Sequence, residues 1–414
     1  MDDRTPPGSR YVGGVFCGAR VKPKIGLFLS ALPRHGGAFQ FSHSVLEALA
    51  SLPLERFEKV AAFTERVWSR RLSAHCIPGW EVRSPILKLL AFKRIAGWLP
   101  VRLWRTALIR HLRSTRSLLG LSCNLWVFPA QETYAYLMPV PSLGVIFDLM
   151  HRYERQFPEV SSKGIYRIRE RHYRNTCRHS RGVLVDSDIG KQHVLESYPM
   201  AAGKVRVLPF VPPRHIHDPI SEGLLPDLPS KFIFYPAQFW MHKNHKRLVQ
   251  AAALVRKKCP DFNLVLVGSK KNAYDSSVES VRELGLSGNI HFLGYVPDSQ
   301  MPALYRRARA MIMPTFFGPT NIPPLEAIAV GCPVAVSNIY GMPHQLGDAA
   351  LYFNPTRVEE MATTMEALWT DDRLCGLLTA RGLRRASEWT QEHFNLRFQE
   401  IVKNILQPNS RETQ

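Results

Sequence analysis

The chain has 414 residues, 45% hydrophobic and 21% charged, which excludes a mostly disordered protein and suggests two or three domains. Its 54 Lys and Arg against 34 Asp and Glu give a formal charge of +20, which favours an anionic partner such as nucleic acid, acidic lipid or a phosphorylated metabolite. No apolar run approaches the roughly 18 residues of a membrane-spanning helix, the N-terminus does not look like a signal peptide, and the seven scattered cysteines form no Cys-x-x-Cys pair. We therefore expect a cytoplasmic protein without a zinc knuckle or a disulfide framework.

Residues 1–21, rich in Gly, Pro and Arg, predict a loose extension, after which short apolar runs alternate with amphipathic segments. Strands are expected at residues 24–30, 59–64, 125–129, 143–148, 183–186 and 205–210, and then at 232–236, 264–268, 290–294, 310–314, 333–336 and 350–353. Helices are expected at 42–51, 165–178, 246–258, 301–307, 324–330, 358–370 and 391–406. Apolar, β-branched strands that alternate with helices predict parallel sheets covered on both faces.

Five prolines between residues 210 and 230 indicate an exposed boundary between two α/β domains. The expected organisation is an extension at 1–21, a first doubly wound domain at 22–212, a linker at 213–230, a second domain at 231–390, and a C-terminal helix and tail at 391–414 that could cross back to the first domain. Ligands of such sheets bind at the carboxyl ends of the strands, so a cleft between the two domains is the expected site.

The first strand is followed by a segment that contains Gly36 and Gly37 and leads into a helix. Two glycines at such a junction let backbone N–H groups approach an anion, and the helix N-terminus adds partial positive charge. The third glycine of a dinucleotide fingerprint is missing, and the segment is not a Walker A loop. A simple tight turn is the alternative.

The charge is concentrated in two segments: residues 82–131 hold nine Lys or Arg and no acidic residue, and residues 151–181 hold nine against three Glu. Within residues 88–116, apolar side chains including two Trp are interleaved with basic ones, and Pro100 is expected to divide the stretch into two helices. Basic amphipathic helices can lie on an anionic membrane, and the candidate contacts are Arg102, Arg105, Arg110 and Arg113. The alternative is a helix packed on the sheet with its basic face in water.

Asp148 ends a predicted strand at the expected cleft, and His151 follows it closely. The carboxylate could orient a sugar hydroxyl or a helix N-terminus, and the imidazole could contact a substrate. Both are candidate catalytic residues, although a lone histidine is more often structural.

Two loops of the second domain are candidate phosphate sites. Lys243 follows the first strand of that domain and precedes a helix, where its ammonium group could meet a phosphate; a solvated surface lysine is the alternative. The second loop runs from residue 314 into a helix that starts with prolines. Its expected contributions are the backbone N–H groups of Thr320, Asn321 and Ile322 for a diphosphate, and a first-turn Glu326 that favours the helix dipole or accepts hydrogen bonds from a ribose diol.

These segments, in this order, resemble family 4 glycosyltransferases of GT-B fold, over roughly residues 22–406. The resemblance rests on Gly36-Gly37, Pro236-Ala237-Gln238 with Lys243, Gly294-Tyr295-Val296-Pro297-Asp298, the loop at 314–327, Gly331-Cys332-Pro333-Val334 and Gly347-Asp348-Ala349-Ala350. It is closest to bacterial sugar transferases that build O-antigen and other surface polysaccharides.

The resemblance implies a retaining, metal-independent enzyme that needs no cofactor beyond its co-substrate. A nucleotide-diphosphate sugar, with GDP-mannose or GDP-rhamnose favoured over UDP sugars, would bind the second domain, and a glycan or lipid-linked acceptor would bind the first. Lys243 matches the lysine that meets the donor phosphates, and Glu326 matches the second glutamate of a Glu-x7-Glu motif, which commonly holds the ribose. The implied donor-binding residues are Gly36, Gly37, Gln238, Lys243, Gly294, Tyr295, Val296, Gly318, Pro319, Thr320, Asn321, Ile322 and Glu326.

Four positions depart from the family pattern. Gln238 stands where an arginine is common, Gly318 where the first glutamate of the motif commonly holds the hexose, Phe147 where many members carry a histidine, and His344 where a glutamate is frequent. An active variant is favoured over an inactive copy because Lys243, Glu326 and the loop between them are kept.

The function expected from these observations is hexose transfer in surface polysaccharide or lipopolysaccharide synthesis, in the cytoplasm or peripherally on the inner face of the cell membrane. A sugar-nucleotide-binding scaffold without activity is the first alternative. A nucleic-acid-binding protein, suggested only by the charge, is the second, and the chain has no recognisable nucleic-acid-binding module.

Overall fold

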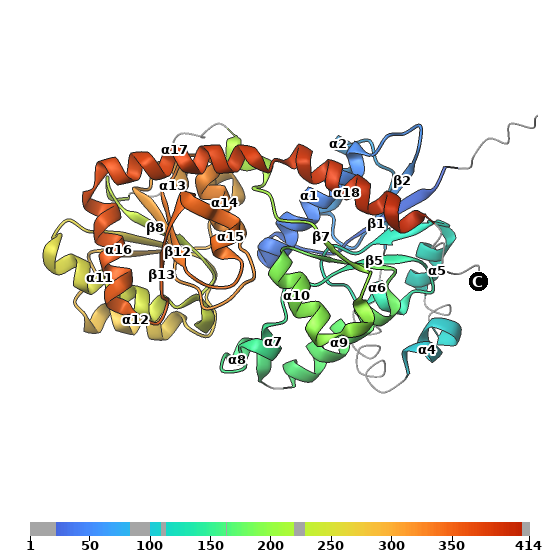
Figure 1. Ribbon diagram of the computed structural model, residues 1–414, viewed down its shortest axis with the longest axis horizontal. Helices are drawn as coiled ribbons and strands as arrows, with labels where there is room; N and C mark the ends of the chain where they lie inside the picture. The colour runs from blue at the N-terminus through green and yellow to red at the C-terminus, as the bar shows by residue number, and fades with distance from the viewer. Residues whose placement is uncertain (1–21, 83–99, 109–112, 163, 219–227, 408–414) are drawn as a thin grey trace, which may run out of the picture.

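The computed structural model describes residues 22–82, 100–108, 113–162, 164–218 and 228–407. Within them the chain forms two parallel β-sheets, of seven and six strands, each packed against helices (Figure 1). The predicted pair of doubly wound α/β sheets is therefore confirmed. The strands expected from the sequence are all present, and most differ from their predicted bounds by only a few residues.

The first sheet has the strand order β3-β2-β1-β4-β5-β6-β7, so the chain starts at an inner strand and winds outward in both directions. Its strands are β1 (Lys24–Leu29), β2 (Glu58–Phe63), β3 (Gly79–Glu81), β4 (Leu125–Val127), β5 (Ser142–Val145), β6 (Gly182–Val185) and β7 (Val205–Val207). Its helices are α1 (Gly37–Ser51), α2 (Val67–Ala74), α4 (Val101–Leu103), α5 (Arg113–Gly120), α6 (Tyr134–Leu137), α7 (Met150–Tyr153), α8 (Pro158–Ser161), α9 (Ile165–His179) and α10 (Asp188–Ser197).

The second sheet has the order β10-β9-β8-β11-β12-β13, with the reversal of strand order between β8 and β11. Its strands are β8 (Ile233–Pro236), β9 (Leu264–Val267), β10 (Ile290–Gly294), β11 (Ala310–Met313), β12 (Val334–Ser337) and β13 (Ala350–Phe353). Its helices are α11 (His245–Lys258), α12 (Tyr274–Glu283), α13 (Met301–Arg307), α14 (Ile322–Ala329), α15 (Met342–Leu346), α16 (Val358–Thr370) and α17 (Asp372–Glu388).

The central strands are continuous apolar runs because each is buried on both faces, as a parallel strand between helix layers must be. Every residue of β8, β9, β11 and β12 is buried. The edge strand β3 was not predicted, because all three of its residues are exposed and it carries no apolar run.

The last helix, α18 (Gln391–Leu406), leaves the second sheet and packs on the first. Figure 1 shows α17 and α18 as an almost continuous band over both halves of the molecule. Phe394 and Phe398 are fully buried in the core formed by β1 and α1. A Cβ on Gly182 would lie 2.7 Å from the Ile405 Cδ1 atom, so a glycine in β6 lets this helix approach the sheet closely. The chain therefore crosses between the two halves twice.

Hydrogen bonds that involve side chains also join the two halves across the cleft. The Glu159 carboxylate accepts hydrogen bonds from the His242 backbone N–H, at 2.9 Å, and from the Asn272 amide, at 3.1 Å. The Gln40 amide donates to Asp298 at 3.0 Å. The described conformation is thus one in which the carboxyl ends of the two sheets are in contact.

Candidate functional site

The Gly36-Gly37 segment lies at the cleft, as its place after β1 requires. A short 3₁₀ turn, η1 (Pro33–His35), is followed by Gly36 with φ of 57°, and Gly37 begins α1. Both glycines are exposed. A Cβ on Gly37 would lie 3.6 Å from the Ile322 Cδ1 atom of α14, so the two predicted anion loops face each other across the cleft.

Gln238 links the loop after β8 to the opposite domain. Its amide Nε2 donates to the carbonyl of Arg34 at 3.2 Å, and its Oε1 accepts from the Trp240 indole at 2.9 Å. In this conformation the Gln238 side chain holds the two loops together.

Lys243 lies close to polar side chains of both halves of the molecule. It ends the 3₁₀ turn η6 (Met241–Lys243), and its ammonium group donates to Asn321 Oδ1 at 3.4 Å. Burial lowers its pKa to about 8, and the nearby Asp148 carboxylate opposes that shift. The structure therefore brings together Lys243, Asn321 and Asp148, which come from three different loops, and puts a cation where the two sheets meet.

The loop from Gly318 to Ile322 is held by side chains from both halves of the molecule. The Thr320 hydroxyl donates to Asp186, which follows β6 in the first sheet. The Asn321 N–H donates to Gln345 Oε1 at 3.2 Å, and the Gln345 amide donates back to the Asn321 carbonyl at 2.9 Å. The prediction that the Asn321 N–H is free for a phosphate is therefore wrong for this conformation. The Pro319 carbonyl also accepts from the Gly341 N–H, at 2.8 Å.

Glu326 does not lie where the sequence predicted it. Helix α14 begins at Ile322, so Glu326 stands in its second turn and is not a partner of the helix N-terminus. The side chain is buried and accepts a hydrogen bond of 2.6 Å from the Tyr305 hydroxyl. Burial, as the largest cause, raises its pKa to about 7, and the Tyr305 hydrogen bond partly offsets that shift.

Asp148 reaches the cleft, but its carboxylate is already engaged. It accepts from the Met150 N–H at 2.9 Å and forms an ion pair with Arg169 on α9. His151 does not reach the cleft, because its side chain is fully buried and its Nε2 lies 3.3 Å from Glu170. The prediction of His151 as a catalytic residue is not supported by this geometry. The adjacent Phe147 packs edge-on against Phe41.

The segment after β10 lies farther along the same edge of the second sheet. Gly294 ends the strand with φ of 70°, and its carbonyl accepts from the Gly268 N–H at 2.8 Å. Tyr295 is 57% exposed, whereas Val296 is buried. A ligand that extends from Lys243 along the carboxyl ends of β8, β9 and β10 would meet this exposed ring.

The predicted membrane surface is only partly described by the structure. Arg102 is exposed, whereas Arg105 is half-buried and donates to the Tyr136 carbonyl at 2.8 Å. Arg110 lies outside the described residues, and Arg113 is the first residue of α5. Trp104 is buried. Trp104 and Arg105 therefore pack on the protein, and of the four predicted arginines Arg102 is the one described as exposed.

Comparison with known proteins identifies the second half of the chain. Residues 218–384 match the family described as Glycosyl transferases group 1. These residues form a group 1 glycosyltransferase domain.

A curated relative, the O-antigen chain mannosyltransferase B of Escherichia coli, is 27% identical over 294 residues, which cover 65% of this chain and 74% of that protein. The serotype-specific mannosyltransferase WbdA of E. coli is 26% identical over 166 residues, which cover 39% of this chain and 20% of WbdA. The Anabaena protein HepE, solved in complex with UDP and glucose, superposes with a TM-score of 0.66 at 16% identity, and the match covers 92% of this chain and 100% of HepE. The structural likeness shows that the glycosyltransferase has the GT-B fold.

Three carboxylates that join the glycosyltransferase's two halves were not predicted. Glu154, Glu159 and Asp186 come from the first half and bind Tyr340, His242 and Thr320 of the second, respectively. Asp186 directly follows β6, so its place at the carboxyl edge of the sheet could have been read from the sequence. Glu154 and Glu159 belong to the short helical segment around α7 and α8, for which the sequence has no clear periodicity.

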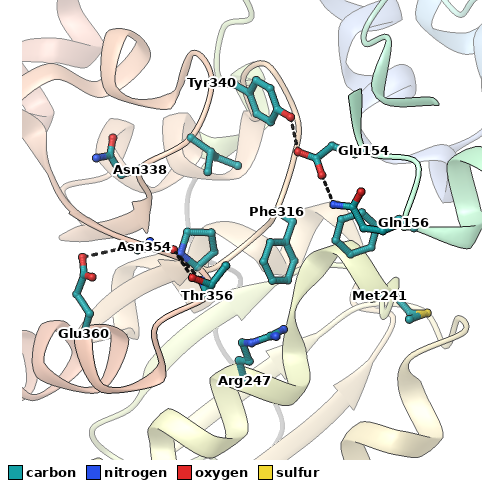
Figure 2. A pocket seen from close by; sticks show the side chains of 13 residues that line it. Glu154, Gln156, Met241, Arg247, Phe316, Asn338, Tyr340, Asn354, Thr356 and Glu360 are labelled. Carbon is teal, nitrogen blue, oxygen red and sulfur yellow. Dashed lines mark hydrogen bonds between the residues drawn. The ribbon is translucent and has the colours of Figure 1, made fainter. Parts of the chain in front are cut away.

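A cavity of about 780 Å³ opens between the same two halves (Figure 2). Phe316, Asn338 and Asn354 contribute to it from the loops after β11, β12 and β13. Glu154, Gln156 and Phe157 line it from the first half. It lies along the same loop as Gly318, because Phe316 is two residues earlier in the chain.

Gly318 has a conformation that few other residues adopt. Its φ is 125°, and a Cβ at this position would lie 2.9 Å from the Asn321 amide nitrogen. The loop is therefore built around a glycine, and the side chain of a glutamate has no room there without a shift of Asn321.

We predict that Gly318→Glu, which restores the residue common in the family, lowers both the free energy of unfolding and the transfer rate. The expected destabilisation is about 1–3 kcal/mol, the usual cost of forcing a side chain into such a backbone conformation. Denaturant unfolding and a transfer assay measure the two effects. Gly288→Glu is the control, because a Cβ there meets no neighbour within 4 Å. A faster Gly318→Glu enzyme would instead mean that the absence of a glutamate at this position lowers the activity of the parent enzyme.

Among the described residues, no group of three or more His, Cys, Asp or Glu side chains could hold a metal ion. No helix in the described part of the chain is long and apolar enough to cross a membrane.

Proposed function

We propose that this glycosyltransferase moves a hexose, mannose before rhamnose, from a nucleoside-diphosphate sugar to a glycan or lipid-linked acceptor, with retention of configuration. The observation that carries the proposal is the position of Lys243 between the carboxyl ends of two doubly wound sheets, in a domain of the group 1 family. The relatives named as O-antigen mannosyltransferases support the choice of sugar and of a surface polysaccharide as the product.

The proposed roles follow from the geometry. Lys243 offsets the charge of the donor diphosphate, which lies between α14 and the Gly36-Gly37 loop. The exposed Tyr295 and the buried Glu326 contact the nucleoside. The acceptor hydroxyl attacks on the face that the diphosphate leaves, and a phosphate oxygen of the leaving group takes its proton. Such a step needs no strong base from the protein, and the binding energy goes into stabilising the charge of the departing diphosphate.

A donor screen tests the proposal. The melting temperature is measured with GDP, UDP and dTDP, each well above its expected dissociation constant. A ligand at 100 times its dissociation constant adds about 2.7 kcal/mol to the free energy of unfolding. We expect the largest rise with GDP, followed by sugar transfer or slow hydrolysis of GDP-mannose. Binding without any turnover would instead support a scaffold without activity.

We expect activity to persist in excess EDTA. Lys243 and the N-terminus of α14 would supply the positive charge that a divalent cation provides in other enzymes. The sequence contains one Asp-x-Asp motif, Asp186-Ser187-Asp188, and its Asp186 carboxylate already accepts hydrogen bonds from the Thr320 and Ser187 hydroxyls. The transfer rate is measured before and after chelation. Complete loss of activity that Mg²⁺ or Mn²⁺ restores would contradict this metal-independent arrangement.

An anionic membrane surface is a further proposed partner, supported by nine Lys or Arg without an acidic residue at 82–131. Each basic residue near such a surface contributes about 1 kcal/mol. We expect the protein to co-sediment with phosphatidylglycerol vesicles at low salt, and Arg102→Gln to reduce that binding. Arg282→Gln is the control and should leave the binding unchanged, because Arg282 is an exposed arginine on α12. Equal binding to neutral vesicles would contradict an electrostatic contact.

A further inference from the structure

The cavity in Figure 2 adjoins the turn that carries Lys243, since Met241 of η6 and Arg247 of α11 line it, but Lys243 itself is not part of its lining. Most of its lining from the second half comes from the loops after β11, β12 and β13, whereas Tyr295, a proposed nucleoside contact, follows β10. Its volume of about 780 Å³ is within the range of small-molecule sites, roughly 300–1,000 Å³. The cavity can therefore hold a ligand of several rings.

The lining combines aromatic faces with planar polar groups. Phe316 and Tyr340 present rings, and Asn338 also lines the cavity, drawn in Figure 2 without a dashed line to any other residue. Among the described residues the Asn338 side chain makes no hydrogen bond, and Asn338 is exposed. A ring beside unpaired amide donors and acceptors suits a sugar, because one face of a sugar ring is made of C–H groups and its rim carries hydroxyls.

The charge of the lining argues against an anionic ligand. Although the chain as a whole carries +20, the cavity has one cation, Arg247, against two carboxylates, Glu154 and Glu360. The Arg247 guanidinium lies over the Phe316 ring at 5.3 Å from its centre. A nucleotide or a phospholipid headgroup would meet a net negative surface here, so a neutral ligand fits better.

The cavity spans both halves of the enzyme. Glu154 accepts a hydrogen bond from the Tyr340 hydroxyl at its rim, as the dashed line in Figure 2 shows. A ligand that contacts both Glu154 and Glu360 would favour the closed arrangement of the two halves, because the complete lining exists only there. Phe316 connects the cavity directly to the loop that holds Gly318.

We propose that this cavity binds a neutral oligosaccharide, the part of the glycan acceptor that lies beyond the sugar unit receiving the hexose. The proposal rests on the proposed function, because only a glycosyltransferase has an acceptor. Binding of a saccharide in this cavity, however, does not require a bound donor. Asn338 and Glu360 bind hydroxyls, and Phe316 stacks on a ring. The site would give the enzyme a preference for an acceptor that already carries several sugars.

Titration with neutral saccharides, without any nucleotide, tests the site. The probes are mannose and α-linked mannotriose, followed by NMR saturation transfer, with maltotriose and cellotriose as trisaccharides of other sugars. We expect at least one trisaccharide to bind more tightly than its monosaccharide. Asn338→Ala and Glu360→Ala should each weaken that binding by about tenfold, the usual effect of losing one or two hydrogen bonds.

Glu359→Ala is the matched control, because Glu359 is also exposed in the first turn of α16 but does not line this cavity. Its trisaccharide affinity should equal that of the parent protein. Unchanged affinity in both the Asn338 and Glu360 variants, or the absence of binding by any trisaccharide, would overturn the proposal. Tighter binding of inorganic phosphate or of a phosphorylated sugar at the same residues would also overturn it.

The melting temperature with GDP, UDP and dTDP separates this inference from the proposed function. If no nucleotide binds while a trisaccharide binds in an Asn338-dependent way, the saccharide site stands and the donor proposal fails. In the other case, Asn338→Ala binds nucleotides normally, its KM for a long acceptor rises about tenfold, and its KM for the donor is unchanged. The saccharide site and the donor proposal are then both supported.

Discussion

Replacing Lys243 with alanine should lower sugar transfer by about two to three orders of magnitude and leave the fold intact. Its ammonium group is close to Asn321 of the second half and Asp148 of the first, and removal of one charge-stabilising group from an active site has effects of this size. Its one hydrogen bond from the side chain, to Asn321, is long at 3.4 Å, so little stability depends on it. Transfer rate, nucleotide affinity and denaturant unfolding are the three measurements.

Lys246→Ala is the matched control. Lys246 is three residues later and is exposed at the start of α11. Its replacement by alanine changes the net charge by the same amount as Lys243→Ala. It should leave transfer and nucleotide affinity near those of the parent. If both survive in Lys243→Ala as well, the assignment of this lysine to the diphosphate is wrong.

The lowered pKa of Lys243 adds a second test. Burial lowers it to about 8, so the free enzyme loses this positive charge as the pH rises through about 8. Affinity for a nucleoside diphosphate should fall over the same range. In Lys243→Arg the fall should disappear, because a guanidinium stays protonated.

Much of the fold could be predicted because its strands are buried on both faces. A run such as Leu264–Val267 has no polar alternation, and only a parallel sheet between helices accommodates it. The exposed β3 and the short helices α7 and α8 lack such a signal, because neither a buried run nor a helical period marks them. The sequence therefore predicts the layers of this protein better than the short connections between them.

The candidate site also has parts that the sequence predicts and parts that it does not. Lys243 and Gly318 could be placed from their position after a strand, since the carboxyl ends of parallel strands share one edge. The environment of a side chain could not be predicted. His151 turns into the core, and Glu326 turns toward Tyr305, because burial and pairing depend on helices that are distant in the chain. The bonds of Asp186 and Gln345 to the Thr320-Asn321 segment arise only when both halves are folded.

Replacing Glu326 with glutamine should weaken binding of a ribonucleoside diphosphate by about tenfold at pH 8. The proposed contact is a ribose diol that donates to the carboxylate, and a hydrogen bond to a charged acceptor contributes about 1.5–3 kcal/mol. Affinities for GDP and for its deoxyribose analogues are measured for both proteins. Glu283→Gln, an exposed glutamate on α12, is the control and should change nothing.

The dependence on pH makes the Glu326 prediction specific. Burial raises its pKa to about 7, so the folded protein keeps a proton between pH 4.5 and 7 that the unfolded chain releases. The free energy of unfolding should therefore fall as the pH rises through this window, and Glu326→Gln should remove that part of the fall. Nucleotide affinity should change in the opposite direction, rising through about pH 7 as the carboxylate forms.

Together, Glu326 and Lys243 predict a bell-shaped dependence of nucleotide affinity on pH, with its maximum between the two pKa values of about 7 and about 8. Tyr305→Phe should move the acidic limb to higher pH, because the Tyr305 hydroxyl donates to Glu326 and favours its charged form. Glu326→Gln should abolish that limb and keep the basic one. An acidic limb that is the same in all three proteins would show that the buried carboxylate supports the fold only and does not bind the ribose.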